Sequence, residues 1–551
     1  MIRDQDLDPV TVTCRDEKVK EGSKKGTKET VCAPEDYESS FVWDAADNTI
    51  FRPISKFFQV DAYGESTNVN AFDEVPDSSW FVNRIGQNAM TPEEAARGYC
   101  PEGPELQSDP KEGAWFVDYG KDNGANPGFR VKVGETKYMF KTDDDVVERA
   151  TAATAIASRI YYAAGYWAPC DAVVYFRRNA LKLKPGLKVK ANIGPSRKFD
   201  EAALTKTLSK TGRRGELFRA TASRWLPGRA LGPFTYEGKR DGDPSDVLPH
   251  EDRRDLRGAK IFAAWLNHFD SREQNSMSTW MPDNPDDPKS RGHVRHWIID
   301  LGDCFGSEWI IDDFSKRHGH SYVMDFGYMA KDFGTLGVVP RPWEHARRTP
   351  GAEIFGYFSD RDFDPDAWYG EYPNPAFSRA TELDAAWATR LIARFTPEHV
   401  AAAVKVGDFT DPAHTKYLYD TLIVRRQVIL RRYFAKLSPV TDVKVESGSV
   451  CAIDLARRTK AYAESAFRYS STITRGEEKE ESAAPVVGAD GRVCIPVGNR
   501  AFAPELAYDA KERYVVVKLR NGASKGPLVL HLYDLGSARG LRLVGIERPS
   551  S

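Results

Sequence analysis

The chain has few cysteines, no excess of charge of either sign and no long apolar run. Seven cysteines in 551 residues are too few for a disulfide-built scaffold, and no C-x-x-C pair marks a zinc-binding module. The 78 lysines and arginines nearly balance 80 aspartates and glutamates, so no global basic field would recruit nucleic acid. No segment approaches the roughly 18 uninterrupted apolar residues of a membrane-spanning helix. Nucleic-acid-binding and membrane-spanning proteins are therefore excluded as default classes.

The cysteines leave the cellular compartment open. Cys14 with Cys32, and Cys451 with Cys494, could form disulfides if the protein were exported. Unpaired buried thiols are the interpretation that we adopt here. Residues 1–6 lack the apolar core of a signal peptide, but a mature exported chain would look the same. We therefore expect a chain without membrane spans, either cytoplasmic or exported.

Composition divides the chain into five parts and predicts an α+β fold. Residues 1–40 are rich in Lys, Glu, Gly and Thr, which predicts a mobile arm. Aromatic residues return among turn formers over 41–112, a pattern typical of a segment that wraps a neighbouring domain. A β-rich lobe with an insertion is predicted at 113–240, a helix-rich lobe at 241–438 and a small β-rich domain at 439–551.

The β-rich lobe begins with strands and a helix in a definite order. Apolar alternation predicts three strands within 114–141, with a glycine-punctuated loop over 120–128 and a lysine, Lys141, at the end of the third strand. Thr142 and the three aspartates that follow it are suited to the start of a helix. Apolar residues then repeat at helical spacing until Gly165 ends the helix.

Two later segments carry residues that suit phosphoryl transfer. Asp270 and Asn275 are separated by four residues just after a predicted helix, and Asp300 ends a β-like apolar run. Phosphoryl transfer needs an aspartate that orients the acceptor hydroxyl, and an amide with a carboxylate to hold Mg²⁺. Asp303 could add a metal ligand or be solvated. The turn formers at 282–288 predict a hairpin tip between the two segments.

Three histidines lie near these segments and could suggest a metal site. They are His268, His293 and His296. His296 is flanked by apolar residues, so we interpret it as a packed or hydrogen-bonded histidine.

The order of these motifs resembles the protein-kinase-like superfamily over about residues 113–437. The D-x-x-x-x-N spacing from Asp270 to Asn275 and the Ile-Asp-Leu-Gly around Asp300 are similar to the atypical branch of phosphatidylinositol kinases and HipA-type kinases. The resemblance implies ATP and Mg²⁺ as cofactors, Asp270 as the catalytic aspartate, and Asn275 and Asp300 as metal ligands. It also matches Lys141 to the lysine that contacts the phosphates of ATP, with Glu148 as its ion-pair partner.

The loop between the first two predicted strands departs from the kinase pattern. Gly124 and Gly128 would cradle phosphates in that family, but the loop is not G-x-G-x-x-G, and a hairpin turn fits it equally well. The chain is also similar to a group of large bacterial proteins that share the segments at 73–81 and 263–272. That similarity implies no biochemical role.

The sequence thus predicts an ATP- and Mg²⁺-dependent phosphotransferase that acts on a protein hydroxyl. The alternative is a catalytically inactive, kinase-like scaffold that serves as an envelope or assembly protein. A lipid kinase ranks third, because no basic amphipathic helix of the membrane-surface type is visible. An adenylyl transferase is placed with it, since a flipped nucleotide would use the same ligands.

Overall fold

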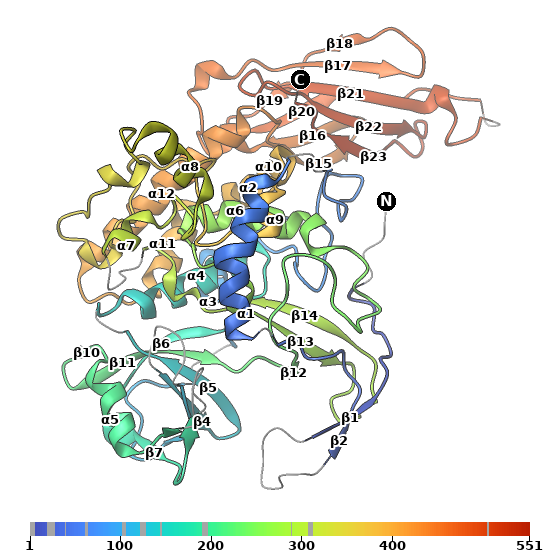
Figure 1. Ribbon diagram of the computed structural model, residues 1–551. Helices are drawn as coiled ribbons and strands as arrows, with labels where there is room; N and C mark the ends of the chain where they lie inside the picture. Colours follow the sequence, from blue (N-terminus) through green and yellow to red (C-terminus); the bar gives the residue numbers. More distant parts are fainter. Residues whose placement is uncertain are drawn as a thin grey trace.

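The fold is α+β, as the composition predicts. Figure 1 shows a sheet-rich lobe, a helical middle part and a C-terminal β domain, with the N-terminal segment running across them. Among the residues described, no helix is both long and apolar enough to cross a membrane. The computed structural model describes residues 6–18, 28–38, 40–60, 64–101, 106–121, 128–143, 146–189, 197–287, 289–306, 312–503 and 506–550.

A mainly antiparallel sheet forms the first lobe. Its order is β10-β11-β5-β4-β3-β7, and β6 also pairs with β11. Alternate residues face the core, and Val117, Val131 and Phe140 are fully buried there. The elements are β3 (Trp115–Lys121), β4 (Gly128–Val133), β5 (Thr136–Lys141), β6 (Asp171–Phe176), β7 (Leu181–Leu183), β8 (Lys188–Val189), β9 (Arg197–Lys198), α5 (Glu201–Ser209), β10 (Arg213–Arg214) and β11 (Leu217–Arg224).

Helix α4, Arg149–Ala164, joins this lobe to the helical part and is buried along nearly its whole length. It begins later than the predicted start at Thr142. The Asp143 carboxylate accepts hydrogen bonds at 2.9 Å from the Thr151 backbone and hydroxyl, so it satisfies free amides at the helix start from outside the helix. The predicted end at Gly165 is confirmed, with φ of 131°.

The second lobe is built on helices around a large aromatic and aliphatic core. Trp265, Trp387 and Leu422 are fully buried in it. A small sheet of order β12-β13-β14 lies at its side. The elements are β12 (Arg229–Ala230), α6 (Arg254–Leu266), β13 (Ser276–Pro282), β14 (Gly292–Ile298), α7 (Asp312–Arg317), α8 (Phe326–Thr335), α9 (Pro375–Ser378), α10 (Glu382–Arg394), α11 (Pro397–Lys405) and α12 (Pro412–Phe434).

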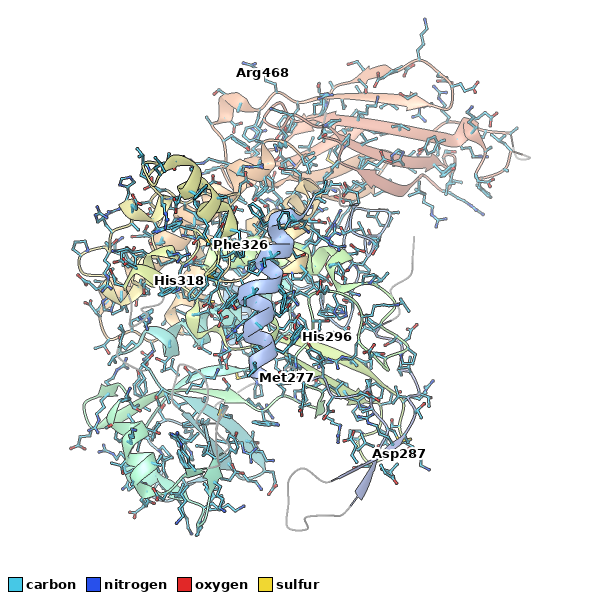
Figure 2. All side chains as sticks on the ribbon, in the orientation of Figure 1. Met277, Asp287, His296, His318, Phe326 and Arg468 are labelled. Carbon is cyan, nitrogen blue, oxygen red and sulfur yellow. A yellow bond between two sulfur atoms is a disulfide. The ribbon has the colours of Figure 1, made fainter. Side chains whose placement is uncertain are left out.

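Strands β13 and β14 form the predicted hairpin. Their register runs from Ser276 opposite Ile298 to Pro282 opposite Gly292, so the proline- and aspartate-rich turn lies at the tip. Figure 2 shows Asp287 at that tip, far from the centre of the molecule.

His296 is packed, as predicted. Its ring stacks on Trp80 with centroids 3.6 Å apart, and its Nδ1 lies 3.0 Å from the Ser278 hydroxyl. Burial lowers the pKa of His296 well below the usual value, so the ring is neutral.

The first described residues differ from the mobile arm expected from their composition. β1 (Arg15–Lys18) and β2 (Lys28–Val31) pair as a hairpin. The Val10 amide donates to the Gly292 carbonyl at 2.8 Å. The Asp6 carboxylate accepts from the Ser79 hydroxyl at 2.7 Å. These specific contacts fix the segment although its composition is polar.

The segment that follows lies along the helical lobe. α1 (Phe41–Ala46), a π-helical stretch (Asp47–Phe51) and α2 (Arg52–Phe58) form one continuous rod, drawn in blue in Figure 1. Farther along, Val75 and Phe81 are fully buried in the core of the helical lobe. α3 (Pro92–Arg97) then packs against α4 and α11.

The last hundred or so residues form a β domain of two sheets. Val450 of one sheet and Val515 and Leu530 of the other share its core. The elements are β15 (Val440–Glu446), β16 (Ser449–Asp454), α13 (Leu455–Arg458), β17 (Ser470–Arg475), β18 (Glu481–Ala483), β19 (Val486–Val487), β20 (Arg492–Pro496), β21 (Tyr514–Arg520), β22 (Leu528–Asp534) and β23 (Leu541–Glu547).

Six of the seven cysteines form disulfides, so the interpretation as unpaired thiols is wrong for them. Two of the bonds, Cys14–Cys32 and Cys451–Cys494, are the pairs considered for an exported chain. The third, Cys100–Cys170, joins the segment after α3 to the start of β6 and was not expected, because its partners are 70 residues apart. Cys304 is free and buried.

Candidate functional site

The segment that carries Asp270 follows directly from the end of helix α6. Asn267 caps that helix in the left-handed conformation, with φ of 52°. Its side-chain oxygen accepts a hydrogen bond from the Trp368 indole at 2.9 Å, which holds the sharp turn in place. The chain then passes Asp270 and makes one 3-10 turn, Glu273–Asn275, before it enters β13.

The β13–β14 hairpin brings the two predicted motifs together. Since Ser276 begins one strand and lies opposite Ile298 near the end of the other, the residues just outside the hairpin are neighbours. The Ile299 amide donates to the Asn275 carbonyl at 3.0 Å. Asp300 follows in a left-handed conformation with φ of 57° and begins a 3-10 turn. Asn275 and Asp300 therefore lie at the same end of the hairpin.

Lys141 reaches this end of the hairpin from the other lobe. It is the last residue of β5, and its Nζ lies 2.5 Å from Asp300 Oδ1. The Lys141 side chain is 15% exposed and that of Asp300 is 39% exposed. The pair thus joins the two lobes and leaves the carboxylate accessible from one side.

Asp270 is held by its backbone and by one arginine. Its amide donates to Asp303 Oδ2 at 3.0 Å, and its carbonyl accepts from the Asn275 side chain at 2.7 Å. Its carboxylate lies 2.7 Å from Arg272 Nε. Burial raises the pKa of Asp270; Arg272 opposes this shift, and the negative charge of Asp300 adds to it.

Two further acids lie beside Asp270: Glu371, which the sequence does not single out, and Asp303, which it allows as a metal ligand. The Glu371 amide donates to the Phe269 carbonyl at 2.7 Å, and the Glu371 carboxyl is hydrogen-bonded to that of Asp270. Burial, together with the charge of Asp270, raises the pKa of Glu371 to about 9. Burial and Asp270 also raise the pKa of Asp303 well above its usual value. The site is thus an acidic cluster in which some carboxyl groups are protonated.

Glu148 does not pair with Lys141, which corrects the expectation from the kinase resemblance. It lies just before α4 with φ of 73°, and its carboxylate accepts from the Thr410 amide at 3.0 and 3.1 Å. The Thr410 hydroxyl also donates to it. The physical reason is the late start of α4, which leaves Glu148 outside the helix and directed toward the segment before α12.

Gly128, the last residue of the glycine-rich loop, lies at the candidate site. Gly128 is the first residue of β4 and lies opposite Lys141 in the sheet register. Gly124, the other glycine predicted to contact phosphates, lies outside the described residues.

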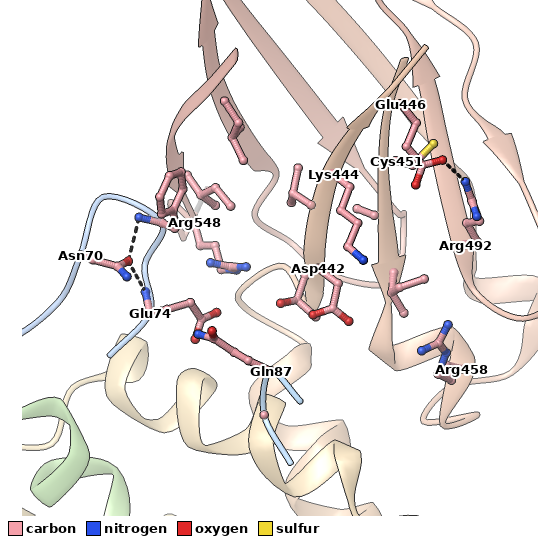
Figure 3. A pocket seen from close by; sticks show the side chains of 18 residues that line it. Asn70, Glu74, Gln87, Asp442, Lys444, Glu446, Cys451, Arg458, Arg492 and Arg548 are labelled. Carbon is pink, nitrogen blue, oxygen red and sulfur yellow. Dashed lines mark hydrogen bonds and ion pairs between the residues drawn. The ribbon is translucent and has the colours of Figure 1, made fainter. Parts of the chain in front are cut away.

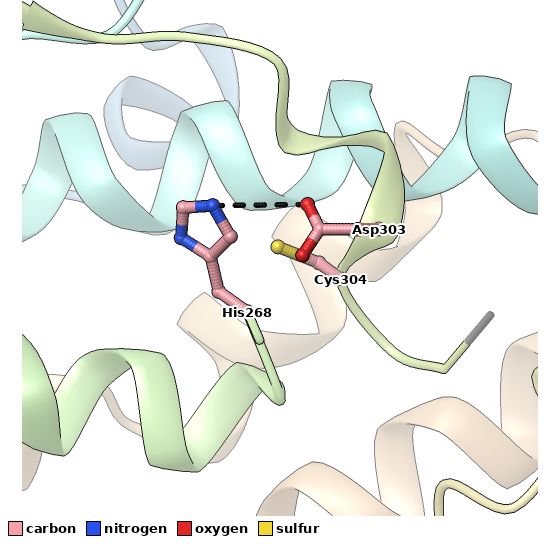
Figure 4. Close-up of side chains that lie close together, drawn as sticks. All are labelled: His268, Asp303 and Cys304. Atoms are coloured by element: carbon pink, nitrogen blue, oxygen red, sulfur yellow. Dashed lines mark ion pairs between the residues drawn. The ribbon is translucent and has the colours of Figure 1, made fainter. Parts of the chain in front are cut away.

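His268 lies beneath the Asp270 segment and is almost fully buried. Its Nδ1 lies 2.9 Å from the Tyr161 hydroxyl, and its Nε2 lies 3.7 Å from Asp303 Oδ1 (Figure 4). Cys304, the free cysteine, is next to Asp303 in the same group. Burial lowers the pKa of His268 to about 3, so the imidazole is neutral at physiological pH.

A separate pocket of about 600 Å³ lies between the segment around Glu74 and the β domain. Figure 3 shows charges of both signs in it, including Asp442, Lys444 and Arg458. None of the predicted site residues that the structure describes lines it. Its mixed charge selects no class of ligand, and we therefore place the candidate site at Lys141 and Asp300.

The chain matches no protein-family model, and it has no significant match among curated proteins or solved structures.

Proposed function

We propose that the chain is an ATP- and Mg²⁺-dependent phosphotransferase with a two-lobed, kinase-like core that acts on a protein hydroxyl. The 2.5 Å contact between Lys141 Nζ and Asp300 Oδ1 carries this proposal. A lysine at the end of a sheet strand beside a carboxylate at a hairpin end is the arrangement that a nucleotide phosphate chain and its metal require. Asp270 and Asn275 lie on the adjoining segment, as the motif order implies.

Each residue has a role that its chemistry fits. Lys141 would bind phosphate oxygens, and the Asp300 carboxylate with the Asn275 amide oxygen would hold Mg²⁺, since oxygen ligands suit that hard cation. The metal, when bound, neutralises phosphate charge. Asp270 would orient the acceptor hydroxyl and take its proton, a task that benefits from a raised pKa.

Phosphotransfer can be tested with two variants of the site. With labelled ATP, Mg²⁺ and a generic protein substrate, wild type should transfer label, and Asp270→Asn and Asp300→Asn should each lower the rate by ~10²-fold or more. Asp286→Asn at the exposed hairpin tip is the matched control and should retain full activity. Equal labelling by wild type and both site variants would rule out catalysis here. Intact mass separates phosphoryl from adenylyl adducts.

A nucleotide-binding scaffold without catalysis is the second candidate. It is favoured by the position of Glu148, because active protein kinases pair the strand lysine with a helix glutamate, whereas Glu148 is bonded to Thr410. A scaffold would show an ATP-dependent rise in melting temperature that Asp300→Asn removes, together with no transfer of label from wild type.

We also infer that the protein folds in an oxidising compartment. Three disulfides hold the N-terminal hairpin, the α3–β6 connection and the β domain, and cytosolic thiols are normally kept reduced. Alkylation of denatured, unreduced protein should label Cys304 alone. Labelling of Cys451 or Cys494 would contradict the inference. Expression in a reducing cytosol should lower stability by ~2–4 kcal/mol per lost bond.

A further inference from the structure

The structure assigns a Zn²⁺ site to His268, Asp303 and Cys304, beneath the Asp270 segment and separate from the proposed Mg²⁺ ligands. One donor atom from each of the three side chains lies within 4.8 Å of the others (Figure 4). His268 is 2% exposed and Cys304 is fully buried. The three donors converge from two segments, the turn after α6 and the 3-10 turn after β14.

Two buried polar atoms face each other here, and neither has a hydrogen-bond partner among the described residues. They are His268 Nε2 and Asp303 Oδ1, and the 3.7 Å between them is too long for a hydrogen bond. A buried polar atom without a partner costs about 1–3 kcal/mol, so such atoms need an explanation. In a tetrahedral zinc site, a nitrogen and an oxygen ligand with bonds of about 2.0–2.2 Å lie about 3.3–3.5 Å apart. The observed separation is about 0.2 Å longer, so a small movement of either side chain would let both atoms bind one ion.

Both residues are oriented by partners that leave the facing atom free. The Tyr161 hydroxyl lies 2.9 Å from His268 Nδ1, and a metal-binding imidazole is normally held at its other nitrogen in this way. Asp303 Oδ2 accepts from the Asp270 amide at 3.0 Å, which leaves Oδ1 toward the histidine.

The donor types select the metal. A nitrogen, a carboxylate oxygen and a sulfur suit Zn²⁺, whereas Mg²⁺ prefers oxygen ligands. Zinc binding would release the proton of the Cys304 thiol, because the thiolate is the ligand. Three protein ligands leave the fourth position for water. The ion would tie the segment of Asp270 to that of Asp300, and its binding does not depend on the proposed phosphotransfer.

Metal analysis of the full-length protein tests the assignment. Wild type purified without chelator should carry about one zinc per chain, and replacement by Co²⁺ should give a thiolate-to-cobalt charge-transfer band. Cys304→Ser should lose that band, and His268→Asn should weaken Co²⁺ binding at least tenfold. His293→Gln, on strand β14 outside the group, is the control and should bind like wild type.

The metal content of wild type tests the zinc site even if a variant fails to fold. Folded wild type that takes up neither zinc nor Co²⁺ would overturn the site, as would an unchanged cobalt spectrum in folded Cys304→Ser. Phosphotransfer with Mg²⁺ is measured separately. A protein that binds zinc but transfers no phosphate would contradict the proposed function and leave the zinc site supported.

Discussion

The Glu371 carboxyl is buried beside Asp270 and keeps its proton at neutral pH in the folded protein. Glu371 is 5% exposed, and its pKa of about 9 compares with about 4.3 in an unfolded chain. Between these values the folded state binds more protons than the unfolded state. Stability from this group is therefore complete below pH 4 and is lost as the pH rises toward 9.

Glu371→Gln, which imitates the protonated carboxyl, should remove this pH dependence. We expect the variant to be more stable than wild type at pH 8 by ~1 kcal/mol or more, with a smaller difference at pH 5. Urea unfolding at the two pH values measures the effect. Glu344→Gln, at an exposed position, is the control and should behave as wild type. Parallel pH profiles for wild type and Glu371→Gln would show that Glu371 ionises normally.

The residues of the candidate site differ in how far the sequence predicts them. Sequence alone predicts that the two motifs lie close together, because a hairpin with a clear turn signal joins them. Local strand pairing then brings together Asp270, Asn275 and Asp300. Glu371 could not be predicted, since contacts distant in sequence place it there, among them the backbone hydrogen bond to Phe269, about a hundred residues earlier in the chain. For Asp303, the sequence offered one indication of a place in the site, which is its position three residues after Asp300.

The helical segment from α1 to α2 has an orientation that the local sequence cannot determine. Its inner side is held by charge: Arg52 Nη2 lies 2.9 Å from Glu273 Oε1, and Asp44 lies 3.4 Å from Arg272. Its outer side is apolar, with Val42 73% exposed and Phe58 75% exposed. A pattern of apolar residues would predict the opposite orientation, because it assumes that the apolar face is buried.

The end of helix α4 could be predicted from the sequence, but its start could not. Its apolar period and its closing glycine were readable, since both depend on residues within the helix. Its start was not, because the carboxylate that accepts from the Thr151 amide near the helix start, Asp143, lies six residues before the helix. The position of Glu148 followed from that start, and so did the missing pair with Lys141.

The N-terminal segment, the helical lobe and the β domain meet at one buried carboxylate, Asp73. Arg254 of α6 and Arg390 of α10 contact it at 2.5 and 3.3 Å, and Arg548, at the end of the β domain, contacts it at 2.6 Å. Asp73 itself is only 8% exposed. These arginines outweigh the effect of burial and hold the pKa of Asp73 well below its usual range.

Because folding lowers the pKa of Asp73, its contribution to stability is present above the unfolded pKa, near 3.9, and is lost as the pH falls below that value.

Asp73→Asn should destabilise the protein at pH 7 by ~3–5 kcal/mol, since it leaves Arg254, Arg390 and Arg548 buried without their shared counter-charge. Urea unfolding followed by domain-specific hydrogen exchange should show the β domain opening before the helical lobe.

The matched control is Asp109→Asn. Asp73 and Asp109 both have a left-handed backbone, with φ of 59° and 50°. The ion pair of Asp109 with Arg177 is exposed, so its loss should cost less than ~1 kcal/mol. If the two variants lose equal stability, the effect reflects the backbone conformation and not the ion-pair cluster. If Asp73→Asn unfolds in one step with unchanged protection of the β domain, Asp73 does not join the parts. The predicted separation is possible because the β domain has a core of its own.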